Sequence, residues 1–168
     1  MSERSSKSGR PKRVTPPPST REYVDNIWAE VVPTNGQEIA RAEALLAVDM
    51  PESWRRLVTA CNGGRPLKNF ILRHGFESCL GRLIRVVGDG TWRRPGLTDV
   101  VSSLRANASW PEGLVPFAFD EGNANHFCVR VGDGSVVLWL HDEDEARRVR
   151  EVATSIDDLL GALSQRPY

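Results

Sequence analysis

The sequence has few cysteines and no long hydrophobic stretch. Its three cysteines, Cys61, Cys79 and Cys128, are odd in number and unrelated in spacing, which favours reduced thiols over a disulfide framework. The longest β-like apolar run covers only residues 136–140, far below the roughly 18 apolar residues that span a bilayer. No apolar stretch follows the basic N-terminal residues, so we expect no secretory signal peptide. These absences predict a cytoplasmic protein without a membrane segment.

The sequence also lacks net charge, but its two signs are unevenly distributed. The 168 residues include 22 basic and 22 acidic ones. Residues 1–21 hold six basic residues and one acidic residue, a net charge of +5, which leaves −5 for the remainder. This segment has almost no apolar side chain and three consecutive prolines, so burial cannot offset its ordering entropy. We predict a disordered, basic, Pro-rich tail over 1–21 and one folded domain over 22–168.

Apolar periodicity predicts several helices in the folded part of the chain. The helical spacing covers residues 22–31, 37–47, 51–61, 98–107 and 156–163. The clearest helix is 51–61, because its apolar positions 54, 57, 58 and 61 share one face. Thr98 is the expected N-cap of its helix, and Ser155 with Asp158 three residues later predicts a capping box.

Short apolar segments rich in β-branched residues predict strands between these helices. The expected strands are 69–73, 83–87, 114–120, 126–131 and 135–141. The Gly-Asp-Gly triplet between the last two is typical of a hairpin turn. A block of strands flanked by helices predicts an α+β fold, with a mainly antiparallel sheet and helices packed around it.

The residue types that carry catalysis do not combine into a site. His126 and Cys128 lie two apart on an expected strand, where a thiol and its base would share a face. Apolar neighbours, however, raise a thiol's pKa and leave it inert. His141 and Asp142 lack the further ligands of a metal-dependent hydrolase, and the cysteines lack zinc spacing. We therefore predict no catalytic residue, no metal and no cofactor.

Aromatic and acidic residues are better candidates for a binding site. Trp92 precedes two arginines in an expected loop, and Trp139 is a second candidate anchor for a partner. The remaining candidate contacts are Asp120, Glu121, His141, Asp142, Glu143, Asp144 and Glu145. Neighbouring antiparallel strands would bring these acidic groups to one sheet edge, where they could cover a basic groove of a nuclease-type partner. The alternative is a solvated loop. The net acidic fold disfavours nucleic acid as the partner.

An ordered series of motifs resembles the SMI1/KNR4 (SUKH) superfamily. The motifs are Asn-Gly-Gly-Arg-Pro at 62–66, Trp-Pro-Glu-Gly-Leu-Val-Pro-Phe-Ala at 110–118, Asp-Glu-Gly-Asn at 120–123 leading to Phe127 and Cys128, and Trp139 with His141 and Asp142. With the capped closing helix, the resemblance extends from about Gly36 to Leu163. It implies an α+β domain. It further implies, for bacterial members, immunity proteins that neutralise toxin domains, often nucleases, by direct binding, whereas fungal members resemble regulators of cell-wall assembly.

Two functions therefore stand as hypotheses. The first is a non-catalytic bacterial immunity protein that binds a cognate, possibly nuclease, toxin stoichiometrically. The second is a regulatory or scaffold protein that binds cellular partners through its basic Pro-rich tail and the SUKH domain. Both expect a protein partner rather than nucleic acid or a membrane. Removing the tail separates them, because an immunity function housed in the fold would survive that deletion.

Overall fold

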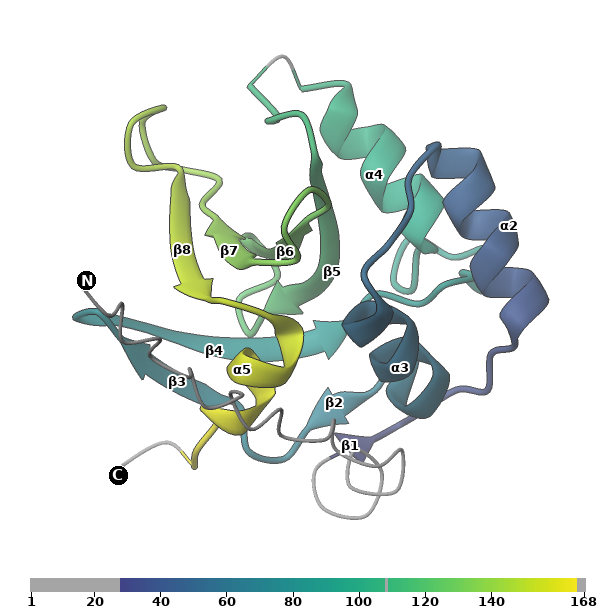
Figure 1. Ribbon diagram of the computed structural model, residues 1–168, viewed down its shortest axis with the longest axis horizontal. Coiled ribbons are helices and arrows are strands. Elements are labelled where there is room, and N and C mark those ends of the chain that lie inside the picture. Colours follow the sequence, from purple (N-terminus) through teal and green to yellow (C-terminus); the bar gives the residue numbers. More distant parts are fainter. Residues whose placement is uncertain (1–27, 108, 166–168) are drawn as a thin grey trace, which may run out of the picture.

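Six antiparallel strands form the main sheet, and they lie in the sheet in the order in which they follow along the chain (Figure 1). They are β3 (Phe70–Arg73), β4 (Phe76–Leu83), β5 (Leu114–Asp120), β6 (His126–Arg130), β7 (Val136–Trp139) and β8 (Val149–Ala153). A separate two-stranded antiparallel sheet pairs β1 (Trp28–Ala29) with β2 (Arg65–Pro66). The computed structural model describes residues 28–107 and 109–165. Within them, the predicted α+β fold is confirmed.

Four helices of the described residues accompany the sheet. They are α2 (Gly36–Leu46), α3 (Glu52–Cys61), α4 (Leu97–Arg105) and α5 (Ile156–Gly161). Figure 1 shows α2 and α4 side by side at one flank, and α5 follows directly from β8. In α2, the Asn35 side chain accepts hydrogen bonds from the backbone of Gln37 and Glu38, which fixes the first turn. None of these helices is both long and apolar enough to cross a membrane.

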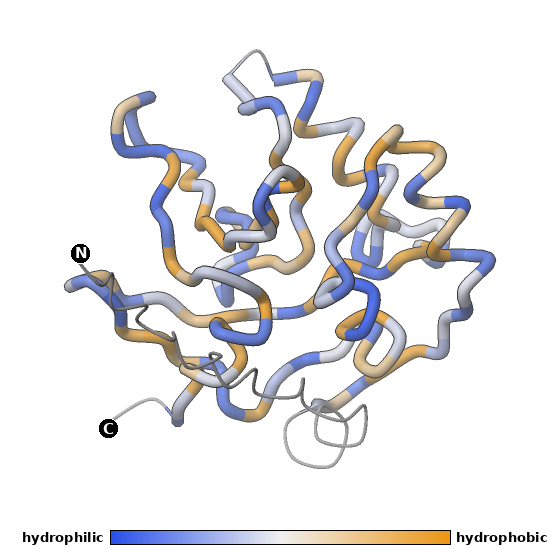
Figure 2. Tube along the Cα trace, in the orientation of Figure 1, coloured by the Kyte–Doolittle hydropathy of each residue, from blue (hydrophilic) through white to orange (hydrophobic). Residues whose placement is uncertain are grey.

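Apolar residues of both sheet faces are buried. The helix-facing side forms the main core, which includes Leu57 of α3 and Phe117 and Phe127 of the sheet. The opposite side carries a smaller cluster around Cys128 and Trp139, against which Trp110 packs. In α3, all four apolar positions that predicted its inner face are at most 1% exposed, so that prediction is confirmed. Figure 2 shows the polar sequence of the loop between β7 and β8, away from this core.

The first predicted helix, 22–31, is wrong where the structure can be compared with it. Residues 22–27 lie outside the described residues, as does the predicted tail 1–21. Trp28 and Ala29 form β1 and pair with Pro66 and Arg65 instead of coiling. The pairing of β1 with β2 holds this segment extended. The Val32 N–H, which donates to the carbonyl of Asn62 at 2.9 Å, extends the same contact.

The predicted strand at 83–87 is also misplaced. The strand that pairs with β3 is β4, which covers most of the segment that we expected to connect two strands. His74 and Gly75, at φ values of 53° and 73°, form a tight turn between β3 and β4. The Ile84 N–H still donates to the carbonyl of Phe117 on β5 at 2.8 Å. Beyond Ile84 the chain leaves the sheet, and Arg85 forms an isolated bridge to Gly96.

Two predicted helix caps differ in detail. Gly96, not Thr98, is the N-cap of α4, and the Asp99 carboxylate accepts its N–H at 3.1 Å. Ser155 caps α5 as predicted, because its hydroxyl accepts the N–H of Asp158 at 3.0 Å. The Asp158 carboxylate does not return a bond to Ser155; it accepts from Thr154 instead.

Candidate functional site

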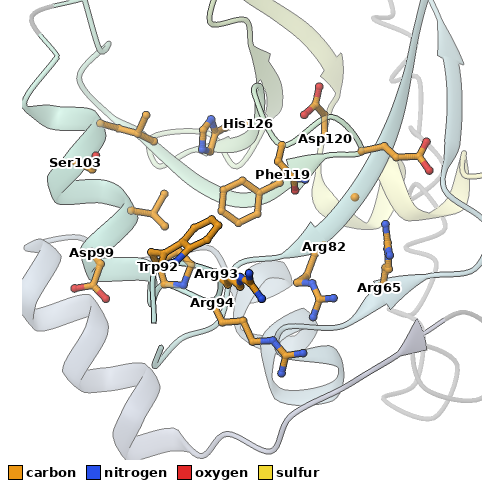
Figure 3. Close-up of a pocket in the computed structure, with 16 residues that line it drawn as sticks. Arg65, Arg82, Trp92, Arg93, Arg94, Asp99, Ser103, Phe119, Asp120 and His126 are labelled. Carbon is orange, nitrogen blue, oxygen red and sulfur yellow. The ribbon is translucent and has the colours of Figure 1, made fainter. Parts of the chain in front are cut away.

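A cavity of about 730 Å³ opens between the main sheet, α4 and the loop that precedes α4 (Figure 3). It is lined by Arg65, Gly81, Arg82, Trp92, Arg93, Arg94, Pro95, Asp99, Val100, Ser103, Leu104, Phe119, Asp120, Glu121, Asn123 and His126. Three of the residues predicted to bind a partner, Trp92, Asp120 and Glu121, therefore border one cavity. They come from segments that are almost thirty residues apart in the sequence.

The loop that carries Trp92 is closed at its base by two glycines. A Cβ added to Gly88 would lie 2.4 Å from the Gly96 nitrogen, so only glycine allows this approach of the two backbones. Within the loop, the Asp89 N–H donates to the carbonyl of Arg94 at 3.2 Å. The Asp89 carboxylate accepts from both the N–H and the hydroxyl of Thr91, which lowers the pKa of Asp89. These contacts hold the loop in a defined shape.

Trp92 stands at the tip of this loop and is 84% exposed, more than any other large hydrophobic side chain in the described part of the chain. The guanidinium carbon of Arg93 lies 5.2 Å from its ring centroid, within range of a cation–π interaction. The Phe119 side chain, from the end of β5, also lines the cavity (Figure 3). Trp92 and Phe119 are therefore two large aromatic side chains in one lining.

Four arginines border the cavity, and we call Arg65, Arg82, Arg93 and Arg94 the arginine rim. Arg82 forms a 2.7 Å ion pair with Glu30, and Arg94 lies 4.0 Å from the same carboxylate. The hydrogen bond from Arg82, followed by the charges of Arg82, Arg94 and Arg65, lowers the pKa of Glu30. Arg65 and Arg93 form no ion pair with any residue between 28 and 165 that the structure describes.

The opposite side of the cavity is the end of β5 and its turn into β6. The Asp120 carboxylate accepts hydrogen bonds from the N–H groups of Ala124 and Asn125 and from the Asn125 side-chain amide at 2.7 Å. The Asn125 side-chain oxygen accepts the N–H of His141 at 3.0 Å. The ends of β5 and β7 are therefore linked, and Asp120 is occupied in shaping the turn.

His126 separates the cavity from the smaller apolar cluster. It is 8% exposed, and its ring centroid lies 5.2 Å from that of Phe119 and 5.9 Å from that of Trp139. Burial, only partly opposed by the charge of Asp120, lowers its pKa from 6.5 to about 4. Its Nδ1 atom has no hydrogen-bond partner among the described residues. At neutral pH the ring is uncharged and contributes an apolar wall.

Trp139 is not part of an exposed surface. It is 1% exposed and its ring packs 5.1 Å from that of Trp110, so it cannot contact a partner without opening the fold. The other predicted contacts after β7 do not line the cavity; all are exposed except Glu143, which is half-buried. His141 and Asp142 have side-chain exposures of 57% and 93%. We call residues 142–145 the acidic loop.

Cys61 and Cys128 are buried thiols with raised pKa values. The Cys128 thiol donates to the backbone carbonyl of His126 at 3.4 Å, and complete burial raises its pKa well above the usual value. Burial also raises the pKa of Cys61 to about 12. Within the described residues, no three His, Cys, Asp or Glu side chains are grouped so that they could hold a metal ion. The polar groups at the cavity suit hydrogen bonds and ion pairs.

Sequence reasoning missed most of the arginine rim and Phe119. Arg65 belongs to the Asn-Gly-Gly-Arg-Pro motif, and Phe119 ends an expected strand, but neither position carries a binding signal of its own. Arg82 was placed in a connecting segment, whereas it lies on β4. Only the pairing of β4 with β5, and the return of the loop before α4, bring these residues together.

The fold and the cavity define an α+β domain with a preformed surface, aromatic at its centre and charged at its border. The model of the SMI1/KNR4 family (SUKH-1) matches residues 33–162, so the chain belongs to this family. The matched range includes all of the cavity-lining residues. A comparison with curated proteins finds no match. The predicted resemblance is thus confirmed, and family membership is consistent with an immunity-type, protein-binding role.

Proposed function

We propose that this protein neutralises a toxin by stoichiometric binding, without catalysis, and that the Trp92 cavity is its principal contact surface. The observation that carries the proposal is an 84% exposed tryptophan at the tip of a loop closed by Gly88 and Gly96. An exposed indole leaves a large apolar area in water, and covering it favours association. Because the loop is shaped in advance, little ordering entropy is lost on binding.

The surroundings of Trp92 support a role in specificity. Tryptophan and arginine are enriched among the residues that dominate binding energies, and both occur here side by side. Charged groups at the border exclude partners of the wrong charge and accelerate association with the right one. The acidic loop and Glu121 remain proposed contacts at the edge of this surface, whereas Asp120 contributes through the turn it holds.

The test is capture of the partner with the tagged full-length chain from the organism that encodes it. The captured protein is identified and expressed alone and together with this chain while growth is recorded. We expect a stoichiometric partner that inhibits growth when expressed alone and does not when expressed together with this chain. Capture of only non-toxic proteins would contradict the immunity role.

The variant Trp92→Ala locates the contact. We expect it to weaken the partner's affinity by at least about 30-fold, as for a dominant interface residue worth roughly 2 kcal/mol. Leu72→Ala is the matched control, because Leu72 is 58% exposed but does not line the cavity. Equal affinity of the two variants would show that the partner binds elsewhere.

A further inference from the structure

We propose that Arg85 is a positioning residue for Trp92: its buried guanidinium holds the Asp89 carboxylate, and this contact fixes residues 88–96, which we call the Trp92 loop. Arg85 itself does not line the cavity. The inference rests on the proposed function for the part that Trp92 plays in binding. It adds the group that orders the loop before a partner arrives, and that order can be measured on the free protein.

The side chain of Arg85 is buried against a glycine. Arg85 is 8% exposed, and it is the only buried residue with a formal charge in the described part of the chain. A Cβ added to Gly63 would lie 2.7 Å from Cγ of Arg85 and 3.0 Å from its Nε, so a larger residue would displace the arginine. Gly63 also has a φ of 67°, which glycine adopts readily. The turn at residues 62–63 therefore fixes where the arginine stem lies.

The guanidinium of Arg85 is directed to one carboxylate. Its Nη1 donates to Oδ2 of Asp89 at 3.5 Å, and no other carboxylate of the described residues lies within 4.0 Å of it. Its Nε has no hydrogen-bond partner among those residues. The side chains are 9% and 35% exposed, so water can solvate the carboxylate alone but not the guanidinium. A buried charge left without its partner is strongly unfavourable, which opposes any movement of Asp89 away from Arg85.

Asp89 passes this restraint on to Trp92. The second carboxylate oxygen, Oδ1, accepts the N–H of Thr91 at 3.0 Å and its hydroxyl at 2.6 Å. The Asp89 N–H donates to the carbonyl of Arg94, and the Arg94 N–H donates to the carbonyl of Thr91, both at 3.2 Å. Trp92 lies between Thr91 and Arg94, inside these bonds. One oxygen of Asp89 therefore faces Arg85 while the other organises the turn that carries the tryptophan.

The base of the loop does not depend on the Arg85 side chain. The Arg85 carbonyl accepts the N–H of Leu97 at 2.8 Å, and the backbones of Arg85 and Gly96 form an isolated bridge. Backbone contacts remain when the side chain at position 85 is changed. A variant at Arg85 should therefore remove the contact to Asp89 while the loop stays attached to the fold at both ends.

Amide relaxation of the free, full-length chain tests this order directly. The chain has five tryptophans, so labelling with 15N-tryptophan gives five backbone amide signals, and the signal lost in Trp92→Phe belongs to Trp92. Arg85→Met removes the guanidinium and keeps an unbranched stem beside Gly63. We expect an order parameter of about 0.8 for the Trp92 amide in the wild type and below about 0.6 in Arg85→Met, as for flexible backbone. The other tryptophan amides should keep their values.

Arg73→Met is the matched control. It removes an arginine that donates to Asp158 at 2.7 and 2.8 Å, and neither residue lines the cavity. We expect it to lower stability in urea without changing the Trp92 amide. Arg85→Lys is the conservative variant. Because it keeps a positive charge near Asp89, its order parameter for Trp92 should lie between those of the wild type and Arg85→Met.

Asp89→Asn tests the same contact from the loop, at a side chain that is 35% exposed, so we expect this variant to fold. The asparagine oxygen can still accept from Thr91, but the NH2 group then faces the guanidinium and offers it no acceptor. We expect increased mobility of Trp92, and no further increase when Asp89→Asn is combined with Arg85→Met. An additive increase would mean that Arg85 acts on the loop by another route, and the inference would be wrong.

Binding of the captured partner supplies a second readout. Arg85→Met should lower its affinity by about 5-fold or more, because the loop must then be ordered on binding, whereas Arg73→Met should stay within about twofold of the wild type. In a chain that already carries Trp92→Ala, Arg85→Met should have little further effect. A general structural defect would weaken binding in both backgrounds.

An unchanged order parameter of Trp92 in Arg85→Met or in Asp89→Asn would overturn the inference, as would equal effects of Arg85→Met and Arg73→Met on that amide. Failure of the proposed function is distinguishable, since a captured protein that is not toxic, or that binds elsewhere, leaves the relaxation result unchanged. Conversely, a toxin that binds through Trp92 with equal affinity for the wild type and Arg85→Met would overturn this inference alone.

Discussion

Trp92 and Trp139 show how differently the fold treats two residues that looked equivalent as candidate anchors. Trp92 is outside any apolar periodicity, and the closed loop keeps it 84% exposed. Trp139 ends β7, where its neighbours across the sheet include His126, and it is 1% exposed. The neighbouring sequence of Trp139 gives no sign of which sheet face the tryptophan occupies, because the register with β6 decides this.

At Asn62 a single residue links three segments of the chain, through its side chain and its backbone carbonyl. Its side-chain oxygen accepts the buried N–H of Val86 at 2.8 Å, and its carbonyl accepts the N–H of Val32. We predict that Asn62→Ala lowers the free energy of unfolding by about 1–3 kcal/mol, because the N–H of Val86 loses its partner inside the protein. Urea denaturation measures this.

Asn107→Ala is the control for that measurement, since among the described residues the Asn107 side chain bonds to Ser109 alone, at an exposed turn. Its effect should stay below about 1 kcal/mol. If the two substitutions lower the free energy of unfolding by the same amount, the buried hydrogen bond of Asn62 is not a significant source of stability.

His126 gives the stability a pH dependence. Its pKa is lowered from 6.5 to about 4, so between these values the unfolded chain binds the proton more readily than the folded one. Stability is then complete above pH 6.5 and falls as the pH decreases toward 4, by up to about 1.4 kcal/mol per pH unit. We predict that His126→Phe flattens this slope between pH 6.5 and 5.

Urea unfolding at several pH values compares the two slopes, and slopes are unaffected by any constant packing defect that phenylalanine introduces. The range above pH 5 avoids most of the titration of carboxylates with lowered pKa values, such as Glu30 and Asp133, which contribute below that range. An identical slope in the variant would mean that His126 is protonated equally in both states.

At the scale of elements, helices were easier to predict than the first strands. The helices α2, α3, α4 and α5 follow from apolar spacing, which is a property of neighbouring residues, and α5 follows also from its Ser155 cap. The hairpin of β3 and β4 depends on a His-Gly turn, in which the non-glycine residue His74 takes a positive φ. A His-Gly pair is not among the usual turn signals. The apolar pattern therefore predicted the second strand at 83–87, although β4 ends at Leu83.

The hairpin and the last helix are joined by a two-point ion pair. Arg73 donates to both carboxylate oxygens of Asp158, at 2.7 and 2.8 Å, which lowers the pKa of Asp158. We predict a coupling free energy of about 1 kcal/mol in a double-mutant cycle of Arg73→Ala and Asp158→Ala, because bidentate geometry is favourable although both side chains are partly exposed.

The same cycle at Arg147 and Asp144 is the control. These side chains are 71% and 65% exposed and approach only to 4.0 Å, so their coupling should be about 0.5 kcal/mol or less. Both cycles are measured by thermal or urea unfolding. A coupling at Arg73 and Asp158 no larger than that of the control would assign the stability of α5 to packing and to its Ser155 cap alone.

At the scale of the whole molecule, the sequence predicted the family and the charge asymmetry but not the composition of the cavity. Trp92, Asp120 and Glu121 were identified as isolated candidates, and the acidic loop was expected beside them. The structure links the ends of β5 and β7 through Asn125, yet it leaves the acidic loop outside the cavity and brings arginines into it. The charges that line the cavity come from segments far apart in the sequence. A local sequence pattern therefore cannot predict which of them lie together.

The final prediction concerns the basic segment 1–21. Residues 1–21 carry a net charge of +5. If binding is housed in the fold, deleting them should leave the partner's equilibrium affinity and the protection of growth within about threefold of the wild type. The association rate and its salt dependence should change, because long-range charge acts mainly on encounter.

Surface plasmon resonance at low and physiological salt measures both quantities, with Trp92→Ala in the full-length chain as the counterpart that should lose affinity. The opposite pattern, in which the deletion abolishes capture while Trp92→Ala retains it, would favour a regulatory or scaffold protein that binds through its basic segment. The two variants thus assign the partner to the fold or to the segment before it, and each outcome excludes the other mode as the principal contact.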